Sequence, residues 1–163
     1  MNDTLQEYMD KGYSIVWDID GTLTEARWAG KDLHMFNETS YSLKKLHFDR
    51  KNLHIKPLPV MVAMVAKIKG DQYVISNTHD SIEDRNKDVV LDEFFPKIIK
   101  ERRFYTRTRM DKIEVLQILA EKDPEKNFVF ISDSLEELIE ANDYFHDNGI
   151  GNVSFYHTSS LFL

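Results

Sequence analysis

At 163 residues, 42% of them hydrophobic, the chain is large and apolar enough for one domain with a core, which excludes an intrinsically disordered protein. Its net charge of −7 argues against general nucleic-acid binding, and the absence of cysteine excludes disulfides, thiolate zinc sites and a thiol nucleophile. The sequence shows neither a signal-peptide pattern nor a run of roughly 18 apolar residues, so we expect a cytoplasmic protein without a membrane partner.

Short apolar stretches alternate with helical periodicity along the chain. In chain order we expect a strand over 13–18, a helix over 57–70, a strand over 72–76, a helix over 81–95, a strand over 97–100, a helix over 111–122, a strand over 128–132, a helix over 134–149 and a strand over 153–157. Alternating strands and helices are typical of a parallel sheet covered on both faces. The prediction is a single α/β domain spanning 1–163, with a Rossmann-like five-stranded parallel sheet.

Helix-boundary residues support these ranges. Pro59 suits the first turn of the first helix, and Gly70 is expected to end it in a left-handed conformation. The third helix opens with Asp111 and Glu114 in the spacing of a capping box.

Residues 24–56 interrupt the alternation after the first strand. A connection of that length inside a compact domain is usually functional, so we interpret it as a short cap or flap. Its aromatic and basic residues would suit a nucleotide or a nucleic-acid end, but they would equally suit a hairpin that packs its rings on the core. These residues are Trp28, Phe36, Tyr41, Phe48, Lys44, Lys45, Arg50 and Lys51. His34, His47 and His54 of this segment lack the spacing of a zinc helix.

Polar residues stand at the carboxyl ends of three predicted strands, where open α/β sheets bind their ligands. They are Asp18 with Asp20, Ser76 with Asn77, and Ser132 with Asp133. Converging carboxylates repel one another unless a cation compensates them, and oxygen donors favour Mg²⁺. The other interpretation of the aspartate pair is a solvated loop.

These residues also carry a family resemblance. The sequences "DIDGT" (18–22), "VISNT" (74–78), a helix-borne lysine and "FISDSLEE" (130–137) resemble the four motifs of the haloacid dehalogenase (HAD) superfamily, in order and across nearly the whole chain. The resemblance implies that Asp18 attacks phosphorus to form an aspartyl-phosphate. Asp20 would protonate the leaving oxygen and then activate water.

The resemblance implies further roles around the two aspartates. Lys112 would neutralise the nucleophile and the phosphoryl oxygens. Asp133 would hold Mg²⁺ together with Asp18 and the backbone carbonyl of Asp20. Thr22, Ser76 and Asn77 are assigned to substrate binding, with Ser76 on the phosphate.

Glu137 has two interpretations. It stands where the family has its second acidic residue of this motif, which suggests a metal ligand. The family usually has glycine before Asp133 and aspartate four residues after it, whereas this chain has Ser132 and Glu137. Glu137 also lies three residues after Ser134, in the spacing of a helix cap.

The expected function is a Mg²⁺-dependent phosphomonoester hydrolase acting on a small phosphorylated substrate. Family members that cleave carbon–halogen bonds lack the second aspartate, so the resemblance through Asp20 favours phosphate esters. Transfer to an acceptor other than water, or a catalytically idle binding or regulatory module on the same fold, are the alternatives.

Two other features bear on the substrate. Basic residues gather between 97 and 112, which suggests an anion site or else a solvated loop. They are Lys97, Lys100, Arg102, Arg103, Arg107, Arg109 and Lys112. His79 follows Asn77 closely enough to contact a substrate, or it is a surface residue.

Overall fold

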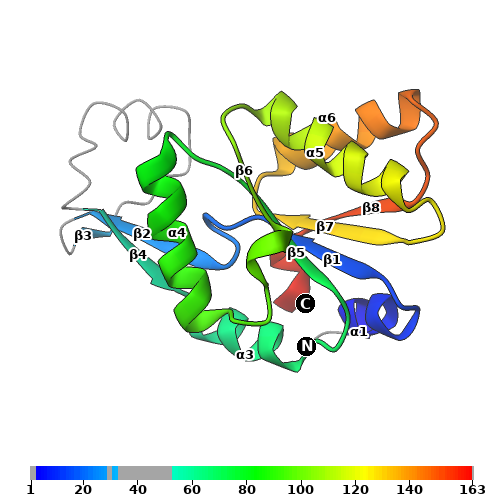
Figure 1. The fold of residues 1–163 in the computed structure, drawn as a ribbon. Helices are drawn as coiled ribbons and strands as arrows, with labels where there is room; N and C mark the ends of the chain where they lie inside the picture. The colour runs from blue at the N-terminus through cyan, green and yellow to red at the C-terminus, as the bar shows by residue number, and fades with distance from the viewer. Residues whose placement is uncertain (1–2, 29–30, 33–52, 163) are drawn as a thin grey trace.

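A five-stranded parallel sheet forms the centre of the chain in the computed structural model, which describes residues 3–28, 31–32 and 53–162 (Figure 1). Its strand order is β6-β5-β1-β7-β8. The strands are β1 (Ser14–Trp17), β5 (Gln72–Asn77), β6 (Arg103–Thr106), β7 (Phe128–Ser132) and β8 (Val153–His157). The prediction of a Rossmann-like α/β fold with five parallel strands is confirmed.

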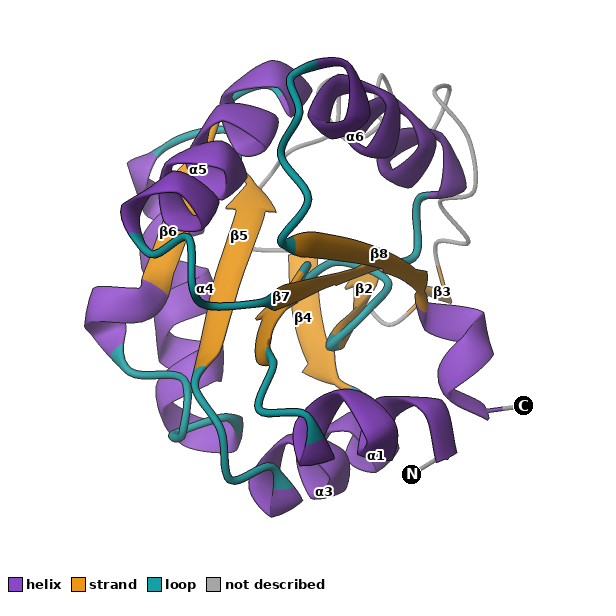
Figure 2. Cartoon of the chain, turned by 90° about the vertical axis from the view of Figure 1, so that its right-hand side faces the viewer, coloured by secondary structure: helices purple, strands orange, loops and turns teal. Residues whose placement is uncertain are grey.

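Helices cover both faces of this sheet (Figures 1 and 2). The helix α5 (Arg109–Lys122) and the helix α6 (Leu135–Asp147) pack on one face. The other face carries α1 (Asp3–Asp10), α3 (Pro59–Lys67), α4 (Ser81–Phe94) and the 3-10 turn η2 (Thr158–Phe162). Within the described ranges, no helix is both long and apolar enough to cross a membrane.

Alternation along the central strand divides the core between the two faces. Ile15 and Trp17 belong to the cluster under α1 and α3, whereas Val16 belongs to the cluster under α5 and α6. All three side chains are fully buried, as expected for a strand covered on both faces. A residue two positions after Val16 therefore continues toward α5, which decides where Asp18 lies.

The segment that follows the first strand contains a second, smaller sheet. Its strands are β2 (Thr24–Trp28), β3 (Lys31–Asp32) and β4 (Leu53–Pro57), in the order β3-β2-β4 and antiparallel. It leaves the main sheet beyond β1 and lies beside α4 (Figure 1). The aromatic, basic and histidine side chains predicted for this segment lie outside the residues whose side chains are described.

The predicted strand over 97–100 is wrong. Phe95 and Ile98 are buried in the core, and the chain turns between them through a hydrogen bond from Ile98 N to Phe95 O. The 3-10 turn η1 (Lys100–Arg102) follows, and the edge strand β6 begins at Arg103. Two buried anchors one turn apart fix a turn there, and the aromatic residues that follow supply the strand.

Two helix boundaries also differ from the predictions. Helix α3, predicted over 57–70, ends at Lys67, before Gly70, which does not adopt a positive φ. Helix α5 begins at Arg109, and its capping box joins Thr108 to Asp111 instead of Asp111 to Glu114. The side chain of Thr108 accepts a hydrogen bond from Asp111 N. The Thr108 hydroxyl therefore occupies the capping position that was predicted for the Asp111 carboxylate.

A buried polar chain joins the central sheet to α3. The indole Nε1 of Trp17 donates to Gln72 Oε1 at 3.0 Å, and Gln72 Nε2 donates to the carbonyl oxygen of Val65 at 3.1 Å. Gln72 is 1% exposed, so no water replaces either bond if its amide is removed. The amide thereby satisfies an indole and a carbonyl near the C-terminal end of α3.

Gln72→Leu should lower the free energy of unfolding by about 1–3 kcal/mol, because it leaves the indole N–H of Trp17 buried without an acceptor. Urea unfolding measures the change. In a Trp17→Phe background the same substitution should cost measurably less, since the donor has gone. Equal costs in both backgrounds would contradict this account.

Candidate active site

The carboxyl ends of three neighbouring strands bring the predicted site residues to one edge of the sheet. Trp17 pairs with Val74 of β5 and with Ile131 of β7, so the three parallel strands lead to the same edge of the sheet. Asp18 continues β1, and its backbone N–H donates to Ile131 O at 2.9 Å. Residues far apart in sequence therefore meet at this edge, as the strand-end argument predicts.

Asp18 is paired with Lys112. The ammonium nitrogen of Lys112 lies 2.8 Å from Asp18 Oδ1, and both side chains are largely buried. Strand alternation directs Asp18 toward α5, and Lys112 stands in the first turn of that helix. The structure thus brings together the two residues to which the resemblance gives the roles of nucleophile and neutralising lysine.

Glu137 completes a buried triad with this pair. Its Oε1 and Oε2 lie 2.9 and 3.1 Å from Lys112 Nζ. Ser134 caps α6, as predicted, through a 3.3 Å hydrogen bond from Glu137 N to Ser134 Oγ. The Glu137 side chain therefore contacts the lysine, while its backbone takes part in the cap. Its expected role as a metal ligand remains a prediction.

Asp133 faces the loop that follows β1. An ideal Cβ placed on Gly21 would lie 2.0 Å from Asp133 Oδ2, so the carboxylate lies directly against the glycine. Gly21 also has a φ of +76°, which a residue with a side chain rarely adopts. The backbone oxygen of Asp133 is 2.9 Å from His157 Nε2, a contact that holds the acidic loop to the end of β8.

The carboxylates of this edge are electrostatically crowded. Burial raises the pKa of Asp18 to about 6, against the opposing effect of Lys112, and the charges of Glu137 and Asp20 add to the rise. The pKa of Asp133 is raised to about 7, first by desolvation of its carboxyl and then by the charges of Asp18 and Asp20. In both groups the effect of burial and of neighbouring negative charge on the pKa exceeds that of nearby positive charge.

The residues fit Mg²⁺ in donor chemistry. Asp18, Asp20 and Asp133 offer only oxygen atoms, and their mutual repulsion is what a divalent cation would relieve. Among the described side chains, no group of three or more acidic or histidine residues is already arranged around a metal position.

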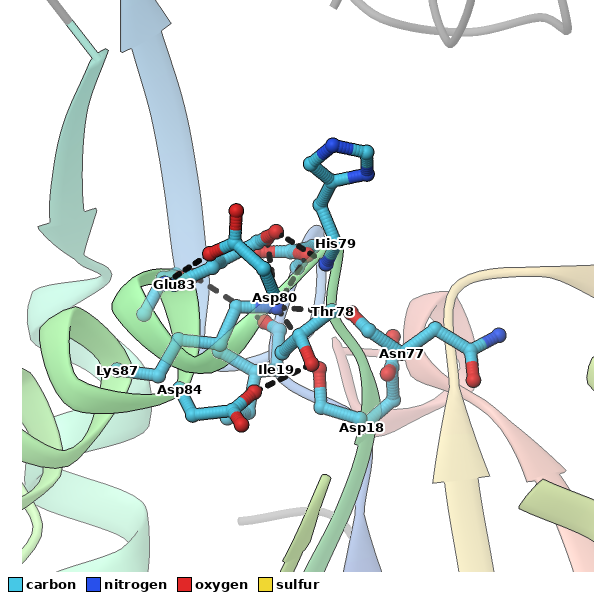
Figure 3. Close-up of polar contacts among 12 residues, drawn as sticks. Asp18, Ile19, Asn77, Thr78, His79, Asp80, Glu83, Asp84 and Lys87 are labelled. Atoms are coloured by element: carbon cyan, nitrogen blue, oxygen red, sulfur yellow. Dashed lines mark hydrogen bonds and ion pairs between the residues drawn. The ribbon is translucent and has the colours of Figure 1, made fainter. Parts of the chain in front are cut away.

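A second lysine, Lys87 of α4, contacts Asp20. Its ammonium nitrogen lies 2.8 Å from Asp20 Oδ2 and 3.0 Å from Ser76 Oγ. It also donates to the backbone oxygen of Asn77 at 3.1 Å. The Lys87 side chain is completely buried, and Figure 3 shows it reaching from α4 toward the strand ends.

Sequence reasoning missed Lys87, although a signal for it exists. The buried positions of α4 are Glu83, Lys87 and Leu91, which follow one another at four-residue intervals. Two charged residues thus occupy the helix stripe that should be apolar. A lysine on a core-facing stripe requires acceptors, and Asp20 of the first motif together with Ser76 and Asn77 of the second supplies them.

The other predicted substrate-binding residues have partners within the chain. Thr22 is fully buried, and its hydroxyl oxygen lies 3.2 Å from Thr158 Oγ1 of η2. The side-chain oxygen of Asn77 accepts a hydrogen bond from Thr106 Oγ1 of β6. These contacts position the loops, and substrate binding by either residue remains a prediction.

The ring of His79 projects away from Asp18 (Figure 3). Its backbone N–H donates to Glu83 Oε2 at 2.6 Å, and its ring points away from Asp18 and Asn77 (Figure 3). The backbone contact fixes the first residues after the second motif to α4. A contact between the ring and a substrate remains a prediction.

The basic residues between 97 and 112 have separate partners on several elements. Three of them pair with carboxylates of α4: Lys100 with Asp92, Arg103 with Asp88 and Asp92, and Arg107 with Asp84. Arg102 pairs with Asp71, Arg109 with Glu136 and Glu140, and Lys97 donates to the carbonyls of Ala66 and Ile68. Of the set, Lys112 alone contacts the predicted site residues among the described contacts. An anion site among these residues remains a prediction.

Comparisons with known proteins give a distant likeness of fold. The sequence matches no protein-family model and no curated protein. Among solved structures, the chain is similar to the HAD domain of effector protein Lem4 from Legionella pneumophila. The two are 15% identical with a TM-score of 0.49, over 89% of this chain and 85% of that chain. Nothing about activity follows from so distant a likeness.

Gly21→Ala should disrupt the site as well as the backbone, because its new methyl group would collide with the Asp133 carboxylate. Gly12→Ala is the matched control, with a φ of +77° and nothing within 4 Å of the new Cβ. Both should lose about 1 kcal/mol of stability from the positive φ. Only Gly21→Ala should lose substantially more in thermal unfolding; similar losses would contradict the close approach.

Metal-free protein should lose stability as the pH rises from about 4 toward 7. A carboxyl whose pKa is raised in the folded state holds its proton there when the unfolded chain has lost it, so ionisation opposes folding across this range. Asp133→Asn should flatten this part of the profile and raise the melting temperature in EDTA at pH 8 more than at pH 4. A parallel profile would show that Asp133 is not repelled.

Proposed function

We propose that this protein is a Mg²⁺-dependent phosphomonoester hydrolase that acts through an aspartyl-phosphate. One observation carries the proposal: the aspartates that end the central strand are each bonded, at 2.8 Å, to a different buried lysine. A nucleophile and an acid–base group need different environments. Pairing Asp18 with Lys112 and Asp20 with Lys87 gives the two neighbouring carboxylates different environments. The motif resemblance supports the same assignment.

Asp18 is assigned the attack on phosphorus. A carboxylate needs no base to deprotonate it, but it needs positive charge nearby to approach a phosphate dianion. Lys112 supplies that charge at Asp18 Oδ1 and is itself oriented by Glu137. In the first step an Asp18 oxygen bonds to phosphorus as the bond from phosphorus to the leaving oxygen breaks.

Asp20 is assigned the proton transfers. In its protonated form it gives its proton to the leaving oxygen, which departs as an alcohol. The resulting carboxylate then takes a proton from water as that water attacks phosphorus, which releases phosphate and regenerates Asp18. Asp20 retains solvent access, with 32% of its side chain exposed, as a group that exchanges protons with substrate and water requires.

Asp18, Asp133 and the backbone carbonyl of Asp20 would hold Mg²⁺. When bound, the cation would neutralise phosphoryl oxygens and the carboxylates around them. The substrate class proposed is a small phosphorylated molecule. A nucleotide or the phosphorylated end of a nucleic acid is a narrower proposal, suggested by the aromatic and basic residues of the segment 24–56.

Asp18→Asn should abolish phosphate release from 4-nitrophenyl phosphate while the protein stays folded. Loss of the nucleophile removes several kcal/mol of transition-state stabilisation, or several tenfold steps in rate. Asp71→Asn is the control, because Asp71 precedes β5 at the opposite edge of the sheet and pairs with Lys126. Near-normal turnover by folded Asp18→Asn protein would exclude the covalent route. Inactivity of the wild type on a panel of phosphate esters would favour a binding module instead.

EDTA should remove the activity, Mg²⁺ should restore it, and Ca²⁺ should restore it poorly. Calcium accepts more ligands at longer distances, so it can engage both oxygens of Asp18 and occupy the one that attacks. Calorimetry of Mg²⁺ binding should show a large loss of affinity in Asp133→Ala and a smaller loss in Glu137→Gln, which contacts Lys112. Unchanged affinity in Asp133→Ala would place the metal elsewhere.

A further inference from the structure

Lys87 is a buried charge for which the proposed chemistry has so far given no task. The side chain is completely enclosed, and the helix that carries it packs on the face of the sheet opposite α5. Burying an ammonium group is costly unless carboxylates and hydrogen-bond acceptors surround it. The function of Lys87 beside Asp20 can be inferred from the groups to which it donates.

The three N–H bonds of Lys87 are all engaged by the protein. They point to Asp20 Oδ2 at 2.8 Å, Ser76 Oγ at 3.0 Å and the Asn77 carbonyl at 3.1 Å. An ammonium group has three donors, so Lys87 would have to give up one of these bonds to reach a substrate oxygen. This arrangement suits a residue that holds other groups in place.

Glu83, one helical turn before Lys87 on α4, restrains the Lys87 side chain. Its Oε1 lies 3.4 Å from Lys87 Nζ, and its Oε2 accepts the backbone N–H of His79 at 2.6 Å. Glu83 and Lys87 are neighbours on one helix stripe, so the ammonium cannot swing away without leaving the glutamate (Figure 3). The lysine is thereby held to α4 and to the loop after β5 at once.

We propose that Lys87 is a positioning residue that holds Asp20 where it exchanges a proton with the leaving oxygen, and that it does not bind the phosphoryl group. The inference rests on the proposed function and extends it. Lys112 then screens the charge of the nucleophile Asp18, and Lys87 fixes the orientation of the Asp20 carboxylate. Asp18 and Asp20 cannot exchange roles, because each is tied to a cation from a different face of the sheet.

The test compares two phosphate esters in the first turnover. A 4-nitrophenolate leaves without much help from an acid, whereas the alkoxide of glycerol 2-phosphate needs a proton. Lys87→Met combined with Glu83→Gln removes one charge of each sign, which keeps the interior balanced. Lys126→Met combined with Asp71→Asn is the matched control, a pair 2.6 Å apart at the other edge of the sheet.

The site variant should release glycerol about a hundredfold more slowly and nitrophenolate less than about tenfold more slowly. The affinity for inorganic phosphate as an inhibitor should stay within about twofold, because Lys87 does not touch the phosphoryl group. The control variant should keep both rates. Asp20→Asn should show the same selective loss, and adding the Lys87 and Glu83 changes to it should cost nothing more.

Several results would overturn the inference. Equal losses on both esters, or a further loss in the Asp20→Asn background, would make Lys87 a structural residue. A large loss of phosphate affinity would mean that Lys87 acts on the phosphoryl group, directly or through Ser76. Thermal melts establish folding, and Lys87→Gln, which keeps a donor without the charge, replaces methionine if that variant does not fold. A wild type inactive on both esters would overturn the proposed function and this inference together, whereas an active wild type with equal losses overturns the inference alone.

Discussion

Repulsion among the carboxylates that follow β1 and β7 is the constraint around which the rest of the site is arranged. Asp18, Asp20 and Asp133 lie near enough for their charges to act on one another, in a region with limited access to water. A buried carboxylate without compensation costs several kcal/mol. Two helices on opposite faces of the sheet reduce this cost: α4 supplies the buried Lys87 and α5 supplies the buried Lys112.

The two lysines, Lys87 and Lys112, differ in the kinds of acceptor to which they donate hydrogen bonds. Lys87 directs its donors to a carboxylate, a hydroxyl and a carbonyl of the protein. Among the described hydrogen bonds, Lys112 donates only to carboxylates, those of Asp18 and Glu137, and its ammonium also lies 5.3 Å from the centre of the Phe130 ring. A lysine held between carboxylates can turn toward an incoming phosphoryl group, since another anion is an equivalent partner. The difference in partners is what makes the proposed division of roles between Lys112 and Lys87 physically reasonable.

The loops above the strands are braced by polar contacts that involve no acid–base chemistry. Thr22 contacts Thr158, and the Asp133 backbone contacts His157, so the last strand and its 3-10 turn hold both acidic loops. On the other side, Asp84 accepts a bidentate pair from Arg107, at 3.0 and 2.8 Å, and fixes the start of α4 to the end of β6. Rigid loops keep crowded carboxylates at fixed separations, which a site that relies on charge requires.

The sequence by itself determined the layers of the fold, because apolar runs of strand length alternate with helical stripes. It also determined that Asp18, Ser76 and Asp133 share one edge, because parallel strands end together. It did not determine the edge strand, since the burial of Phe95 and Ile98 turns the chain before β6.

Only the tertiary structure decided the partners of the charges. The basic residues near Arg103 are neutralised by acidic residues of other elements, chiefly α4, and Glu137 lies against Lys112. Lys87 meets Asp20 across sixty-seven positions of sequence, because the packing of α4 against the strand ends brings them together. Local pattern fixes which face of an element is buried, but which charges meet depends on how those faces pack.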